Sequence, residues 1–383
     1  MKTTVASPYI DPRRRILVTS DIHGHAAWLK NALTAADFGG DDLLIVVGDL
    51  VEKGPESLET IRTVMSLCRE GRALATVGNV DKWRLHFYRT MAANADEKLA
   101  SELYDYTLMS RDWWGGSFYE EMAAESGCSV DSPAEILATC KQVLNDHKAE
   151  LDFLDSLPAI LTAGKYIFVH GGLPSVNLDD AREADVFSLL KRDWYLREVR
   201  EKNLCFDSYV LVGHFPTALY DERIFCLNPI IDKEHHVICL DGGCGIKTEG
   251  QLNLLILPGI DSDGSEATWI ARDDLPAMRA LDDQAENADP FNIHWGDCAV
   301  RALGSEGDCT LVEHIRTGRR LWAPTEYLYA GGTQCNDITD YRLPVSAGDS
   351  LSLIRSTDRG HIVKKDGVVG WYLGRMESAT END

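Results

Sequence analysis

Polar side chains suited to binding metal ions recur at the ends of short apolar runs. Their motifs are "SDIHG" (20–24), "GDLVEKG" (48–54), "GNVD" (78–81), "FVHGG" (168–172), "GHFPT" (213–217) and "LDGG" (240–243). One polar residue after a strand is common in a loop, but carboxylate, amide and imidazole groups together are what hard and borderline divalent metals prefer. The set therefore predicts a metal centre. Its candidate residues are Asp21, His23, Asp49, Asn79, His170, His214 and Asp241.

These motifs close apolar runs that are rich in Val, Ile and Leu and too short for helices, which is typical of buried strands. The first three runs alternate with segments of helical period at 25–37 and 56–70. The order predicts β-α-β-α-β units in a parallel or mixed sheet. Sites in such sheets lie at the carboxyl ends of the strands, where the polar residues stand.

The rest of the chain is organised differently. Residues 82–157 have a long helical pattern, which predicts a helical cap inserted between two strands. An acidic, poorly periodic stretch at 261–290 predicts a linker. Short strand patterns with glycine turns follow at 291–383, and 296–329 has the same order of features as 341–377. We expect one or two small β-barrels there.

The six motifs, in this order, resemble those of the calcineurin-like metallophosphoesterases. The resemblance covers about residues 15–258 and is strongest to the phosphoprotein phosphatases and to the symmetrical diadenosine tetraphosphatases. It implies an α/β catalytic domain at 1–260, built as a four-layer αββα sandwich of two mixed sheets. The last part of the all-β region looks similar to a Src-homology-3 (SH3) barrel.

The resemblance also implies a cofactor of two divalent metal ions, with manganese, iron or zinc favoured over calcium. Asp21 and His23 would bind the first metal, and the carboxylate of Asp49 would bridge to the second. The remaining ligands of the second metal would be Asn79, His170 and His214. In this scheme a hydroxide that bridges the metals hydrolyses a phosphate ester.

The sequence departs from the family at Val80. The family has a histidine there, taken to be the general acid, and Glu52 stands where the family has the aspartate that orients it. Valine cannot transfer a proton, so three interpretations are open: a slow or inactive enzyme, a preference for good leaving groups, or another acid. His25 is the first candidate for that acid, His86 is a weaker one, and Glu52 itself could donate if protonated.

Two positively charged residues are candidates for binding substrate phosphate. Lys53 stands where the family has an arginine, and it keeps the charge but loses the bidentate fork. Arg192, in "LLKRDWY" (189–195), matches a second family arginine and could supply that fork. A surface charge on a helix is the alternative interpretation of Arg192.

The leading functional hypothesis is a phosphoprotein phosphatase-like phosphomonoesterase that favours good leaving groups. A dinucleoside polyphosphate hydrolase or a phosphodiesterase is the first alternative, because an anhydride needs less acid assistance. A non-catalytic, metal-stabilised scaffold is the second. A peptide or protein partner could dock on the C-terminal barrel through Tyr341, Trp371 and Tyr372, unless these residues only fill its core.

Composition narrows the partners and the location. The 383 residues carry a formal net charge of −23, which would repel a phosphate backbone, so we expect no nucleic-acid partner. No window approaches the length of a membrane span, and the N-terminus lacks a signal-peptide pattern. The ten cysteines form no Cys-x-x-Cys pair. We therefore expect a cytoplasmic protein with reduced thiols.

Overall fold

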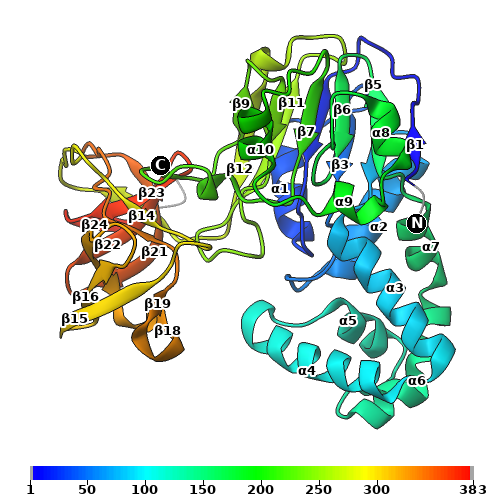
Figure 1. Cartoon of the computed structure of the whole chain (residues 1–383), viewed down its shortest axis with the longest axis horizontal. Coiled ribbons are helices and arrows are strands. Elements are labelled where there is room, and N and C mark those ends of the chain that lie inside the picture. The colour runs from blue at the N-terminus through cyan, green and yellow to red at the C-terminus, as the bar shows by residue number, and fades with distance from the viewer. Residues whose placement is uncertain (1–2, 380–383) are drawn as a thin grey trace. The chain divides into compact units, whose positions relative to one another are not determined.

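A computed structural model describes residues 3–379 of the chain (Figure 1). By its internal contacts the chain divides into two compact units. The first unit consists of Met1–Phe215 and Pro229–Asp273, and the second of Pro216–Asn228 and Asp274–Asp383. The predicted metal ligands all belong to the first unit.

The first sheet of this unit holds the predicted β-α-β-α-β run. Its strand order is β12 (Thr268–Arg272), β11 (Leu252–Leu257), β2 (Ile16–Thr19), β3 (Leu43–Val47) and β4 (Ala73–Thr76). Strands β2, β3 and β4 are parallel, whereas β11 is antiparallel to both β2 and β12. Since every residue of β2 and β3 is buried, these strands read as continuous apolar runs in the sequence.

The second sheet is also mixed. Its strand order is β1 (Val5–Ala6), β5 (Ile160–Ala163), β6 (Tyr166–Val169), β7 (Tyr209–Val212), β10 (Val237–Cys239) and β9 (Ile230–Asp232). Strands β6, β7 and β10 run parallel, so their carboxyl ends reach one edge of the sheet.

One apolar core joins the two sheets. Val18 and Ile45 from the first sheet belong to the same buried cluster as Phe168, Leu211 and Ile238 from the second. Alternate residues of a strand point to opposite faces, so each sheet contributes every second side chain to this core. The α/β fold with two mixed sheets is confirmed, while the exact four-layer order stays a prediction.

Helices flank the sheets and connect their strands. Helix α1 packs against β11 and β12, and α2 packs against β4. Three shorter helices lie between β6 and β7 in the order of the chain. The bounds are α1 (Ala26–Ala35), α2 (Ser57–Arg69), α8 (Leu178–Glu183), α9 (Val186–Leu190) and α10 (Tyr195–Lys202).

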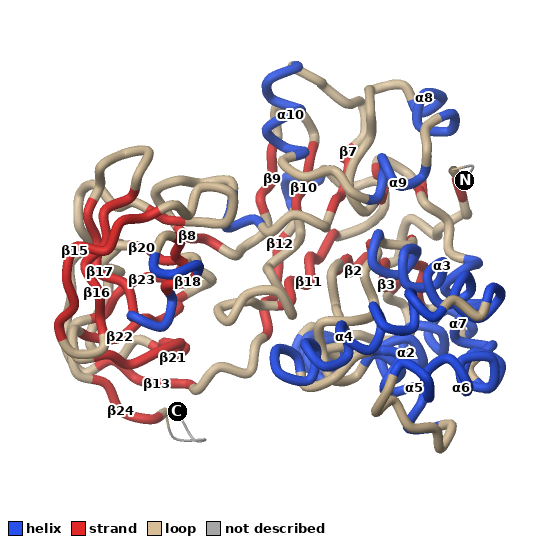
Figure 2. The backbone as a smooth tube through the Cα atoms, turned by 60° about the horizontal axis from the view of Figure 1, so that its bottom comes forward, coloured by secondary structure: helices blue, strands red, loops and turns tan. Residues whose placement is uncertain are grey.

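The stretch predicted as a helical cap is indeed helical. Figures 1 and 2 show its helices gathered into one group. They are α3 (Asn79–Asn94), α4 (Glu97–Trp114), α5 (Phe118–Glu125), α6 (Pro133–Asp146) and α7 (Lys148–Ser156). The side chains of Asp96, Ser117 and Ser132 cap α4, α5 and α6 by accepting backbone N–H groups. In the described chain no helix is both long enough and apolar enough to span a bilayer.

The second unit is built from strands. Its largest sheet has the order β24 (Met376–Ser378), β13 (Ala277–Ala280), β21 (Ser350–Thr357), β22 (Gly360–Lys365), β23 (Val368–Tyr372) and β8 (Phe225–Cys226). A three-stranded sheet contains β15 (Val300–Glu306), β16 (Cys309–His314) and β17 (Arg320–Pro324). Two strand pairs complete it: β14 (Asn292–Ile293) with β20 (Ile338–Thr339), and β18 (Leu328–Tyr329) with β19 (Gln334–Cys335).

The aromatic residues proposed for a peptide groove lie inside this second unit. Tyr341, Trp371 and Tyr372 are all buried, and the indole N–H of Trp371 donates to the carbonyl oxygen of Thr339 at 2.7 Å. They therefore pack the core, as the alternative interpretation predicted. The SH3-like barrel and its number of copies stay predictions.

Two boundaries differ from the expected division of the chain. The stretch expected to be a linker at 261–290 contains β12, which pairs with β11, and β13, which pairs with β21. Both strands were hard to recognise in the sequence, because acidic residues flank them and much of each strand is exposed. In addition, 216–228 groups with the second unit, since β8 pairs with β23.

Candidate metal centre

The strand ends of both sheets meet at one place. Asp21 follows β2, Asp49 follows β3, His170 follows β6 and His214 follows β7. Backbone hydrogen bonds continue past the strands: the N–H of Asp21 donates to Gly48 O at 3.1 Å, and that of His23 to Asp49 O at 3.0 Å. The loops therefore run side by side and bring their side chains together.

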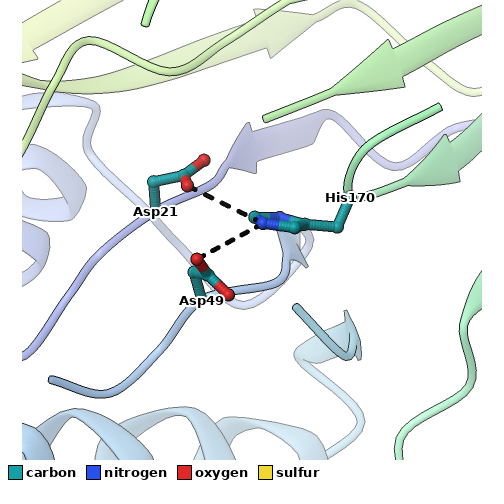
Figure 3. Close-up of side chains that lie close together, drawn as sticks. All are labelled: Asp21, Asp49 and His170. Atoms are coloured by element: carbon teal, nitrogen blue, oxygen red, sulfur yellow. Dashed lines mark ion pairs between the residues drawn. The ribbon is translucent and has the colours of Figure 1, made fainter. Parts of the chain in front are cut away.

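Three buried side chains form the centre of the site (Figure 3). Nε2 of His170 lies 3.3 Å from Oδ2 of Asp49 and 3.9 Å from Oδ1 of Asp21. One ligand atom from each of the three lies within 4.8 Å of the others. Nδ1–H of His170 donates to Val47 O at 2.8 Å, which turns Nε2 toward the carboxylates.

The other predicted ligands surround this trio. Nε2 of His23 lies 3.7 Å from Oδ2 of Asp49 and 3.9 Å from Oδ1 of Asp21. Oδ1 of Asn79, the first residue of α3, lies 3.0 Å from Nε2 of His170. The rings of His170 and His214 have centroids 5.4 Å apart. The structure thus brings the six predicted ligands together.

The charges of the site are poorly compensated by protein groups alone. Burial raises the pKa of Asp21 well above its ordinary value, and the carboxyl of Asp241 adds to the rise. Burial also raises the pKa of Asp241, to about 6. Oδ1 of Asp21 and Oδ2 of Asp241 have no hydrogen-bond partner among residues 3–379. Buried carboxylate oxygens without partners are costly, and a bound cation would offset that cost, so this donor set fits divalent metal ions.

The histidines respond to the same carboxylates in different ways. Burial opposes the charged form of His170, but Asp49 and Asp21 outweigh it and raise its pKa to about 10. Burial lowers the pKa of His23 to about 3, and that of His214 to about 4. A ligating imidazole must be neutral, so His23 and His214 are already in the form that a metal requires.

Backbone strain is concentrated at the site. Among residues 3–379, thirteen non-glycine residues have positive φ, and six of them are predicted site residues, with φ between 46° and 68°. Such backbone costs of order 1–3 kcal/mol per residue and persists where neighbours over-determine it. The six site residues with positive φ are Asp21, His23, Asp49, Glu52, Lys53 and His214. Gly78 shows how tight the packing is, since a Cβ there would lie 2.0 Å from Oδ1 of Asp49.

The predicted phosphate-binding residues lie in different environments. Nζ of Lys53 lies 3.3 Å from Nε2 of His23, at the centre itself. The guanidinium of Arg192 makes a bidentate ion pair with Glu198, with N–O distances of 2.7 and 2.6 Å. The fork of Arg192 is thus already engaged by a carboxylate.

The residues proposed for acid catalysis also have defined partners. Nδ1–H of His25 donates to His23 O at 2.7 Å, and its ring contacts that of Trp28 in a tilted arrangement with centroids 4.5 Å apart. Val80 contributes its backbone N–H, which donates to Oδ1 of Asp49 at 2.9 Å. Glu52 is buried and forms an ion pair with Arg84 at 2.9 Å.

Three residues in and around the site escaped the sequence analysis. Asp81 accepts the N–H groups of Leu50 and Gly78, both at 2.9 Å, and so ties two loops together. Its place in "GNVD", three residues after the helix N-cap, was an available signal for a capping role. Oδ1 of Asp193 lies 2.8 Å from Nε2 of His214. Neither Asp193 nor Arg84 carried a local signal, because their partners are distant in sequence.

Comparison with known proteins agrees with this geometry. The model of the calcineurin-like phosphoesterase family matches residues 14–230. The chain therefore belongs to this family of metal-dependent phosphoesterases, and it is a hydrolase that acts on phosphoric esters.

Individual relatives carry two kinds of name. The chain is 28% identical over 181 residues to serine/threonine-protein phosphatase 2 of Salmonella typhimurium, covering 47% of this chain and 68% of that protein. It is 46% identical over 61 residues to the symmetrical bis(5'-nucleosyl)-tetraphosphatase of Ralstonia nicotianae, covering 16% of this chain and 21% of that protein. A solved serine/threonine phosphatase from Saccharomyces cerevisiae aligns with a TM-score of 0.41 and 13% identity, over 70% of this chain and 84% of that one.

Proposed function

We propose that this chain is a phosphomonoesterase of the phosphoprotein phosphatase type that favours substrates with good leaving groups. The observation that carries the proposal is the contact at position 80. Val80 approaches Asp49 with only a backbone N–H, at 2.9 Å, and brings no proton donor to the leaving group. General acid catalysis contributes roughly 100- to 10,000-fold. Its loss weighs most on alkyl phosphates such as phosphoserine and least on aryl phosphates such as phosphotyrosine, since a phenol has a pKa of about 10.

Within this proposal, the buried cluster would hold two divalent cations. Asp21 and His23 would bind one of them, Asp49 would bridge, and His170 with Asn79 and His214 would bind the other. Such ions, when bound, lower the pKa of water and stabilise the charge that develops on a phosphoryl group. Manganese, iron and zinc all suit this donor set.

The protein groups would position and charge-balance the phosphate. The Nζ of Lys53 lies 3.3 Å from Nε2 of His23, and this ammonium would contact the phosphate as a point charge. Arg192 could contribute only after breaking its ion pair with Glu198. We therefore propose it as a second phosphate contact that forms in exchange for that ion pair. For His25 we keep the role of an alternative proton donor: because Nδ1–H is already donated to His23 O, the transferred proton would be a second one, carried on Nε2 of the imidazolium.

A dinucleoside polyphosphate hydrolase is the second candidate. The identity of 46% to a symmetrical tetraphosphatase supports it, although over only 61 residues. An anhydride also releases a nucleotide phosphate, which needs little protonation, so the chemistry of Val80 is compatible with both candidates.

A substrate panel with Mn²⁺ tests the proposal. We expect turnover of p-nitrophenyl phosphate and a phosphotyrosine peptide to exceed that of a matched phosphoserine peptide by about 100-fold or more. Diadenosine tetraphosphate belongs in the same assay, with Asp49→Asn as the inactive control. Hydrolysis of diadenosine tetraphosphate without hydrolysis of either peptide would replace the first candidate by the second.

A further inference from the structure

The carboxylate of Glu52 is the most fully engaged acid beside the metal centre. Its Oε1 pairs with Nε of Arg84 at 2.9 Å and accepts the hydroxyl of Tyr88 at 2.9 Å. Its Oε2 accepts the hydroxyl of Tyr106 and the N–H of Phe118, both at 3.2 Å. All four partners come from the helical insert, on α3, α4 and α5. Glu52 thus joins the loop after β3 to three inserted helices.

Arg84 is the cation of this cluster, and it is built into the protein interior. Its side chain is 5% exposed, and its guanidinium lies over the ring of Tyr106 at 3.6 Å and that of Trp83 at 4.4 Å. A buried guanidinium needs an opposite charge and a close aromatic environment to offset its desolvation. Glu52 supplies the charge and Tyr106 the aromatic face.

The positions of Val80 and Arg84 on α3 explain how the loop is held. Residues four apart lie on one face of a helix, so Val80 and Arg84 face the same loop one turn apart. The N–H of Val80 holds Oδ1 of Asp49 at 2.9 Å, and Arg84 holds Glu52 three residues further along. Helix α3 therefore contacts this loop at two points, Asp49 and Glu52.

The loop needs such restraint because its backbone is strained. Asp49, Glu52 and Lys53 have φ values of 52°, 65° and 62°. Residues other than glycine rarely adopt this backbone conformation unless surrounding contacts enforce it. The same loop presents Asp49 and Lys53 to the metal centre, so the restraint bears directly on the site.

We infer that Arg84 is a positioning residue for the reaction: by binding Glu52 it fixes the loop that carries Asp49 and Lys53. It also occupies the carboxylate that would orient an imidazole at position 80, so a histidine placed there gains no partner while Arg84 is present. This inference rests on the proposed phosphomonoesterase function. It assigns Glu52 a structural partner in place of a catalytic one.

A double-mutant comparison tests the inference. The proteins are wild type, Val80→His, Arg84→Met and the combination of both, assayed with Mn²⁺ on aryl and alkyl phosphates of graded leaving-group pKa. We expect Val80→His alone to leave the steep dependence of kcat on leaving-group pKa unchanged, and the double variant to flatten it. Arg84→Met alone should lower kcat about 10- to 100-fold, since small displacements of reacting groups have effects of that size. Arg84→Lys should recover part of the loss.

Controls separate positioning from simple instability. Arg89→Met removes an exposed arginine from the same helix, and we expect it to leave kcat unchanged. If Arg84→Met does not fold, Tyr106→Phe removes one donor to Glu52 and should lower kcat in the same direction. A flattened profile for Val80→His alone, or an unchanged kcat for folded Arg84→Met, would overturn the inference.

A second readout needs no turnover. Hydrogen exchange of the amides in 48–54, measured without metal, should be faster in Arg84→Met than in wild type and unchanged in Arg89→Met. Equal exchange in the three proteins refutes the positioning role. If wild type hydrolyses no phosphate ester while the exchange result holds, the proposed function fails and the loop restraint stands.

Discussion

Two buried carboxylates three residues apart, Asp49 and Glu52, are used in opposite ways. Asp49 faces Nε2 of His170 at 3.3 Å and Nε2 of His23 at 3.7 Å, in a cluster where the neighbouring Asp21 leaves one oxygen without a hydrogen-bond partner. Glu52 has an ion pair and three hydrogen bonds, all from protein groups. The first region leaves a buried carboxylate oxygen that a cation could bind, whereas in the second both oxygens of the carboxylate have protein partners.

The difference shows how one short loop serves both chemistry and stability. A site that binds metal must leave buried oxygen atoms without protein partners, and this costs folding free energy. The cluster at Glu52, whose carboxylate has an ion pair and three hydrogen bonds, lies beside it and holds the strained backbone in place. Removing a group from each region should therefore give opposite patterns of activity and stability.

The largest effect is expected for Asp49→Asn, which acts on the metal side. We expect kcat/KM for p-nitrophenyl phosphate to fall by about 1,000-fold or more. Metal ions stabilise the charge of the transition state by several kcal/mol, and each 1.4 kcal/mol is about a factor of ten in rate. Steady-state assays with Mn²⁺ measure the loss, and Asp155→Asn on the surface is the control. Activity within tenfold of wild type would remove Asp49 from the proposed ligands.

The next effect, on stability, is expected for Glu52→Gln. Breaking a buried ion pair leaves the Arg84 charge uncompensated and should lower the free energy of unfolding by about 3–5 kcal/mol. Urea unfolding without metal measures the change. Glu59→Gln, which breaks the exposed pair with Lys30, should cost less than about 1 kcal/mol. Equal losses for the two variants would contradict the contrast drawn between Asp49 and Glu52.

Metal addition should stabilise wild type but not a variant that lacks one of the proposed metal ligands. At a free Mn²⁺ concentration 100 times the Kd, binding to the folded state alone adds about 2.7 kcal/mol to the free energy of unfolding. Thermal unfolding with Mn²⁺ and with chelator measures the difference. Asp21→Asn should remove most of the shift, whereas Tyr106→Phe, on the Glu52 side, should retain it.

The smallest effect concerns Glu121, a carboxylate of the insert that lacks the arginine which Glu52 has. It accepts the N–H groups of Ser57 and Leu58 at 2.8 and 2.9 Å, yet burial raises its pKa to about 7. Because the folded protein holds this proton to a higher pH than the unfolded chain, the stability it confers is complete below pH 4.5 and is lost as pH rises toward 7. The free energy of unfolding should fall by about 2 kcal/mol between pH 5 and pH 7.

Unfolding of metal-free wild type and Glu121→Gln at both pH values isolates this contribution. The variant should show a smaller loss of stability between pH 5 and pH 7, because glutamine does not titrate. The same slope in both proteins would assign the pH dependence to other groups.

Much of the site was predictable from sequence because its residues stand at strand ends. Apolar runs that close on Asp21, Asp49 or His170 indicate both the strand and the edge of the sheet at which the candidate ligand lies. The helical insert was equally visible, since helical periodicity is a local property. The limits of the C-terminal unit were not, because β8 and β13 are short, partly exposed strands whose pairing partners are far along the chain.

The sequence by itself determined which groups could bind metal and that position 80 has no proton donor. Only the tertiary structure decided how the other charges are used: Glu52 is bound by Arg84, Arg192 by Glu198, and His214 lies beside Asp193. The physical reason is that residue type and local order determine where the strands end, and the candidate ligands stand directly after those ends. The partner of a buried charge depends on which surfaces the folded chain brings within about 3 Å, and no local pattern records that distance.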